Sequence, residues 1–116
     1  MTPTIEREWF TRAGSRGLVL RGLVLCGYVE LLDGHPWREL ASWDVPASVH
    51  GGVSFAGRLR SREGYWIGFD CAHAGDAMPT LDGRMIGDRV WSVDEVAEEI
   101  EQLAEQAREA ARSLER

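Results

Sequence analysis

The sequence contains no lysine, only two cysteines, and no apolar run near the roughly 20 residues that span a bilayer. Without lysine, the chain has no residue for Schiff-base chemistry or for a lysine-dependent phosphate loop. Cys26 and Cys71 are too few for a disulfide framework, so we expect reduced thiols on buried strands. Because no basic segment followed by an apolar stretch opens the chain, we expect no secretory signal and no membrane partner.

Length and charge limit the classes of function further. The 116 residues suffice for one domain, in which we expect residues 1–91 to supply a sheet with loops and residues 92–116 a helix. Of the net charge of −6, residues 92–116 carry −5, from eight acidic residues and three arginines. The remainder is nearly neutral, which excludes sequence-independent DNA binding. A small anionic ligand stays compatible, because a few arginines and backbone amides suffice to bind it.

Strand patterns dominate the first part of the chain. Residues 1–13 predict an edge strand or a short ordered arm. Residues 16–32 are aliphatic and predict either one long bent strand or two strands broken at Arg21–Gly22. Residues 53–59 and 65–71 read as two strands joined by a hairpin turn at 61–64. The stretches at 37–51 and 72–91 are rich in Gly, Pro and Asp, and we expect irregular loops there.

The helix has the clearest signal. Ser92 and Glu95 form the pattern of a capping box. Apolar residues then recur at spacings of three and four: Val93, Val96, Ile100, Leu103, Ala107, Ala110 and Leu114. Such a stripe predicts a helix packed across the sheet, or one whose C-terminal half pairs with a second copy in a homodimer. The expected fold class is therefore α+β: a small, mainly antiparallel sheet with long loops and one C-terminal helix.

The chain has three histidines, His35, His50 and His73, and each lies within two residues of Gly or Pro. If the loop at 37–51 returns to the strand it left, the three imidazoles converge at one end of the sheet. His50 and His73 are then candidates for a general acid and base. Asp70 and Asp76 are candidates to orient a histidine ring or to cap turns.

Other residues near the histidines have the properties of ligand contacts. Gly51 and Gly52 lack Cβ atoms, so a ligand can approach their backbone and two successive amides can face an anion. Trp37 and Trp43 are candidates for ligand contact or loop anchors, and Trp66 for a stacking platform or a core residue. Trp91, beside the helix start, is expected in the core. No pair of spaced Cys or His motifs of the zinc kind is present, so we expect no metal and no cofactor.

Four segments together resemble a family of small tailed-phage proteins without assigned activity. They are Cys26–Val29, Gly34–Pro36, Val49–Val53 and Trp66–Asp76, the last containing Gly-Phe-Asp-Cys-Ala-His-Ala-Gly-Asp. The similarity covers roughly residues 20–110, and this last run is the most specific part. The resemblance implies a phage origin and expression in the host bacterial cytoplasm. It implies no reaction.

Three functions are compatible with these features. The first is sequestration of a nucleotide-derived ligand, by analogy with phage proteins that capture signalling nucleotides of host defence. The second is a small hydrolase acting on a nucleotide or its glycosidic bond, with His50 or His73 as acid or base. The third is a protein–protein inhibitor that acts through the acidic helix, in particular Glu98, Glu101 and Glu105.

Overall fold

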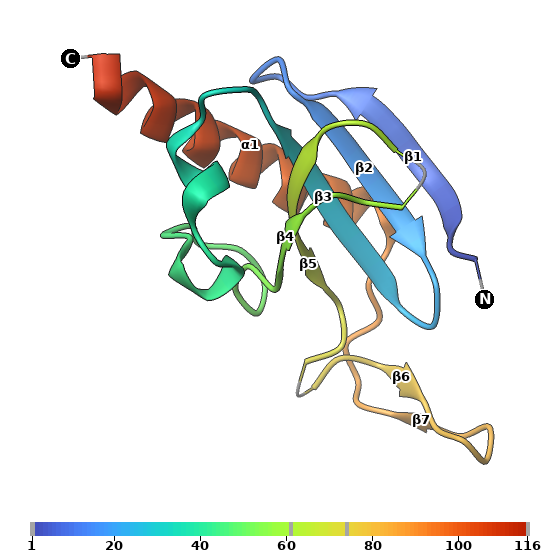
Figure 1. Cartoon of the computed structure of the whole chain (residues 1–116). Helices are drawn as coiled ribbons and strands as arrows, with labels where there is room; N and C mark the ends of the chain where they lie inside the picture. The colour runs from blue at the N-terminus through green and yellow to red at the C-terminus, as the bar shows by residue number, and fades with distance from the viewer. Residues whose placement is uncertain (1, 61, 74, 116) are drawn as a thin grey trace.

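The structure, a computed structural model, describes residues 2–60, 62–73 and 75–115. Five strands form one antiparallel sheet in the order β1-β2-β3-β5-β4, and helix α1 (Val93–Glu115) crosses one of its faces (Figure 1). The strands are β1 (Thr4–Phe10), β2 (Arg16–Arg21), β3 (Leu25–Leu31), β4 (Phe55–Gly57) and β5 (Tyr65–Asp70). This architecture confirms the predicted α+β class.

The strand predictions hold in part. Residues 16–32 form two strands rather than one, because the chain turns between Arg21 and Leu25 and pairs β2 with β3. Residues 4–10 form the edge strand β1. The predicted strand at 53–59 is wrong in length, since only Phe55–Gly57 pair with β5. The predicted turn at 61–64 begins at residue 61, which lies outside the described residues.

The core lies between the sheet and the helix. Val29 of β3 stands opposite Ile67 of β5, and both are fully buried together with Ile100 of the helix. Gly27 is the close-approach point, because a Cβ there would lie 2.8 Å from the Phe69 ring and 2.9 Å from Ile100 Cδ1. The absence of a side chain at Gly27 therefore lets the helix approach the sheet.

The helix begins as its sequence predicts. The Glu95 amide donates to Ser92 Oγ at 3.1 Å, and the Ser92 amide donates to Glu95 Oε1 at 3.0 Å, which is a complete capping box. The apolar stripe is buried from Val96 to Ala107, Val93 and Ala110 are partly buried, and Leu114 is 68% exposed. No helix in the described part of the chain is long and apolar enough to cross a membrane.

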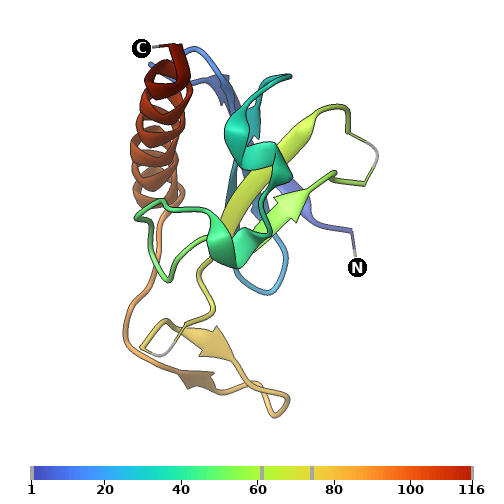
Figure 2. The ribbon, with the colours of Figure 1, turned by 60° about the vertical axis from the view of Figure 1, so that its left-hand side comes forward.

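The segment 72–91 contains a small ribbon that the sequence did not predict. Strands β6 (Met78–Pro79) and β7 (Met85–Ile86) pair and extend away from the body (Figure 2). At its base the Asp88 and Arg89 amides both donate to the Gly75 carbonyl, at 3.0 and 2.9 Å. Gly87 has φ +81°, and a Cβ there would overlap the Asp76 carbonyl oxygen. The backbone at the base of the ribbon therefore packs directly against the backbone of Asp76.

Gly27→Ala tests the contact between helix and sheet. We expect the free energy of unfolding to fall by about 1–3 kcal/mol, because the added Cβ overpacks a filled core. Urea denaturation measures this. Gly22→Ala in the same hairpin is the control, since its Cβ would meet nothing within 4 Å. Equal losses in the two variants would contradict this account of the core.

Candidate functional site

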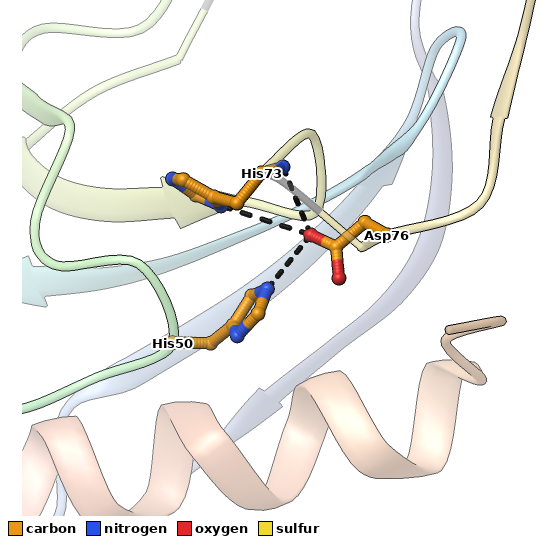
Figure 3. Close-up of side chains that lie close together, drawn as sticks. All are labelled: His50, His73 and Asp76. Atoms are coloured by element: carbon orange, nitrogen blue, oxygen red, sulfur yellow. Dashed lines mark hydrogen bonds and ion pairs between the residues drawn. The ribbon is translucent and has the colours of Figure 1, made fainter. Parts of the chain in front are cut away.

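Two imidazoles and a carboxylate from separate segments meet beside the start of the helix (Figure 3). His50 lies in the turn before β4, and His73 and Asp76 lie in the loop after β5. Asp76 Oδ2 accepts from His50 Nε2 at 2.8 Å and from the His73 amide at 3.0 Å. Asp76 Oδ1 accepts from Trp91 Nε1 at 2.9 Å. The carboxylate is thus the common acceptor for three parts of the chain.

The environment of Asp76 fixes its charge state. Its side chain is only 2% exposed, and burial alone would raise its pKa. The hydrogen bonds from His50, the His73 amide and Trp91 outweigh burial and lower the pKa of Asp76 to about 2. The carboxylate is therefore ionised near neutral pH and can only accept. It follows that neutral His50 carries its proton on Nε2 and has a lone pair on Nδ1.

His50 is held by its backbone and by contacts of its ring with two other rings. Its amide donates to Glu99 Oε1 on the helix at 2.8 Å. Its imidazole lies 4.4 Å from the Trp91 ring and meets His73 edge-on at 5.1 Å. The ring is still 24% exposed, so water reaches it. These contacts orient His50 without sealing it.

His73 has an unusual ring nitrogen. Its Nδ1 lies 3.7 Å from Asp70 Oδ1 and 3.7 Å from Asp76 Oδ2, which is beyond hydrogen-bond distance. The atom is buried and has no hydrogen-bond partner among the described residues. Gly51, with φ +70°, lies against this ring, and a Cβ on Gly51 would overlap the imidazole. Gly51 is therefore required for the position of His73.

The predicted convergence of the histidines is confirmed for His50 and His73 and wrong for His35. His35 caps the 3₁₀ turn η1 (Pro36–Glu39), where Nδ1 accepts from the Trp37 amide, and its Nε2 contacts the Ala107 carbonyl at 2.7 Å. Ala107 and Glu99, the helix residue that binds His50, are eight positions apart, which is about 12 Å along the axis. His35 lies apart from the other two histidines because the loop at 37–51 runs along the helix instead of returning to the strand that it left.

For the tryptophans the structure decides between the predicted alternatives, and it confirms the core position of Trp66. Trp37 is buried in the core, and Trp66 is fully buried with Nε1 donating to the Glu63 carbonyl. Neither ring surface is available for stacking with a ligand. Trp43, in the 3₁₀ turn η2 (Ser42–Asp44), is 82% exposed. Trp91, which we expected only in the core, packs against the core and also binds Asp76.

Asp70 and the glycine pair flank the cluster. Asp70 caps the turn after β5, since its Oδ1 accepts from the Ala72 amide and its Oδ2 from Ser54 Oγ. It is Asp76, and not Asp70, that hydrogen-bonds a histidine ring. Gly52, with φ +82°, faces open space, because a Cβ there would meet nothing within 4 Å.

Both thiols are ill-suited to nucleophilic chemistry. Burial raises the pKa of Cys71 to about 12, and burial also raises the pKa of Cys26. At neutral pH both remain protonated and act as small apolar residues. Cys71 is buried as expected, while Cys26 is only partly buried.

Comparison with known proteins gives no further guide to this site. No protein-family model, no curated protein and no solved structure matches the chain.

Asp76→Asn tests the role of the carboxylate in stability. A folded-state pKa of about 2 against an ordinary value of 3.8 stabilises the fold by about 2 kcal/mol above pH 4. This contribution is lost as the pH falls through 3.8 toward 2. We therefore expect the difference in unfolding free energy between the native chain and Asp76→Asn to shrink over that range. If urea denaturation gives the same difference in unfolding free energy between the two chains at pH 5 and at pH 3, this prediction is contradicted.

Proposed function

We propose that the chain is a hydrolase that acts on a nucleotide, with His50 as general base and Asp76 as its positioning residue. The observation that carries this proposal is the 2.8 Å contact between His50 Nε2 and the buried carboxylate of Asp76. An ionised carboxylate on one ring nitrogen fixes the tautomer and stabilises the imidazolium that forms when the other nitrogen takes a proton. The hydrolase is thus preferred to the other functions that the sequence allows.

The two imidazoles divide the proton transfers. His50 Nδ1 removes a proton from water, and the resulting hydroxide attacks the substrate carbon as the bond to the leaving group breaks. His73, 5.1 Å from His50 between ring centres, gives a proton to the departing group. His50 then releases its proton to solvent and His73 takes one up, so that each residue returns to its starting state.

The charges around His50 and His73 favour cleavage of one type of bond in the substrate. Carboxylates face this pair: Asp76 binds His50, Asp70 lies beside His73, and Glu99 binds the His50 amide. Arg89, over the Trp91 ring, is paired with Glu95 at 2.8 Å. A negative surrounding repels an attacked phosphate but stabilises the positive charge that develops on a sugar when its glycosidic bond breaks. The glycosidic bond of the nucleotide is therefore the proposed point of cleavage.

Sequestration of a nucleotide would use the same surface and leave the ligand unchanged. In either case the nucleotide is proposed by analogy with phage proteins that capture signalling nucleotides of host defence. Capture through phosphate contacts would need cationic or amide donors. The Gly52 amide already donates to the Val49 carbonyl at 2.8 Å, which leaves only the Gly51 amide of the pair, and the charged side chains nearest the imidazoles are acidic. This balance is why we prefer hydrolysis to capture.

The acidic helix offers less support for a protein partner. Glu101 accepts from the Arg12 amide, Glu98 pairs with Arg12, and Glu105 pairs with Arg108. These carboxylates thus already have partners within the chain. A helix-to-helix homodimer remains a prediction.

The assay for the proposed reaction uses purified protein, EDTA and a panel of nucleosides and nucleotides, with products separated by chromatography. We expect release of a free base from at least one compound. His50→Gln should slow this release by about 10²–10⁴-fold, the usual contribution of a general base. His35→Asn is the control, because it changes the histidine outside the site and keeps a helix-capping side chain.

The outcome distinguishes the functions. Recovery of the intact ligand only after the protein is heat-denatured would overturn hydrolysis and support capture. If no compound is depleted or changed, both are overturned.

A pair of glycine variants tests the geometry. Gly51→Ala and Gly52→Ala both place alanine in the left-handed region, so their backbone strain is similar. Only Gly51→Ala displaces the His73 ring. We expect turnover to fall by about 10²-fold in Gly51→Ala, as for an ångström-scale misplacement, and to be largely kept in Gly52→Ala. Equal turnover in the two variants would contradict a role for His73.

A further inference from the structure

The same cluster has the composition of a metal centre. His50, His73 and Asp76 each offer one ligand atom within 4.8 Å of the others. The close contacts join Asp76 Oδ2 to His50 Nε2 at 2.8 Å and to His73 Nδ1 at 3.7 Å. Two imidazole nitrogens and one carboxylate oxygen are a ligand set that zinc and related ions use. We propose that these three atoms bind one divalent transition-metal ion, for which Zn²⁺ is the test ion.

The buried nitrogen of His73 is an independent observation that points to a ligand. Its Nδ1 has no hydrogen-bond partner among the described residues, and a buried polar atom without a partner carries a free-energy cost. A lone pair on Nδ1 that binds an ion removes this cost. Gly51 lies against the same ring, because a Cβ there would overlap His73 Cε1, Nε2 and Nδ1.

The two separations from Asp76 Oδ2 suit an ion bound beside it. Zinc bonds of about 2.0–2.2 Å place tetrahedral ligand atoms roughly 3.3 Å apart. Asp76 Oδ2 is 2.8 Å from His50 Nε2 and 3.7 Å from His73 Nδ1, which brackets that value. Both imidazoles are partly exposed, which leaves water free to supply the remaining coordination position.

The surroundings support a cation in two ways. Trp91 Nε1 and the His73 amide hold the Asp76 carboxylate, as outer hydrogen bonds hold the ligands of known metal sites. Asp70 adds negative charge beside the His73 imidazole, and Glu99 adds it beside the His50 backbone amide. The spacing rule for zinc motifs misses this site because His50 precedes His73 by 23 positions.

Metal binding and the proposed acid–base chemistry exclude each other. The ion takes the place of the proton on His50 Nε2 and removes the hydrogen bond to Asp76, so the loaded site has no His–Asp pair. Zinc is then an inhibitor of the proposed hydrolysis. Binding itself does not depend on the proposed function, because it is measured without substrate.

Calorimetric titration of EDTA-stripped, dialysed protein with Zn²⁺ tests the site. We expect one ion per chain. His50→Gln and His73→Gln should each weaken binding by more than tenfold, and Trp91→Phe by about tenfold through the lost hydrogen bond to Asp76. His35→Asn should bind as the native chain does. Equal affinity in all four variants, or no binding, overturns the proposal.

Nitrogen-15 NMR of the native chain gives an answer that needs no variant. Zinc should shift the signals of His50 Nε2 and His73 Nδ1 and leave both ring nitrogens of His35 unchanged. Shifts confined to other groups, such as the neighbourhood of Cys26, would overturn the assignment. If zinc binds at these atoms but no nucleotide is hydrolysed, the metal site stands and the proposed function fails.

Discussion

The site depends on the hydrogen bonds that the buried carboxylate of Asp76 accepts. This carboxylate accepts hydrogen bonds from His50, from the His73 amide and from Trp91, which belong to three different segments. A charged group with so little exposure is stable only when its acceptor sites are filled. The turn before β4, the loop after β5 and the segment leading into the helix are therefore fixed together by a single electrostatic requirement.

Local patterns account for most of the fold. The capping box at Ser92 predicted the helix start because its two hydrogen bonds lie within four residues. The ribbon of β6 and β7 was missed since two-residue strands leave no alternation to detect. The strand at 53–59 was predicted too long because the sequence pattern does not show where pairing to β5 ends.

The residues of the site were predictable from the sequence, but the contacts between them were not. His50, His73 and Asp76 were candidates from their types and their neighbouring glycines, whereas His35 had the same local appearance. The path of the loop separates them: the Ser48 amide binds Gln106 and the His50 amide binds Glu99, so the loop follows the helix. Such long-range contacts have no local signature. One sequence feature could have indicated that Trp91 belongs to the site: it lies directly before the capping box and close in sequence to Asp76.

The separation of the three donors along the chain has a consequence for biosynthesis. His50 and His73 leave the ribosome before Trp91 and Glu99, the residues that complete their support. A nascent chain that has paired β3 with β5 still lacks the Trp91 indole and the Glu99 carboxylate of the helix. Until those arrive, the Asp76 carboxylate is better solvated by water than by protein. Completion of the Asp76 site is therefore coupled to docking of the helix.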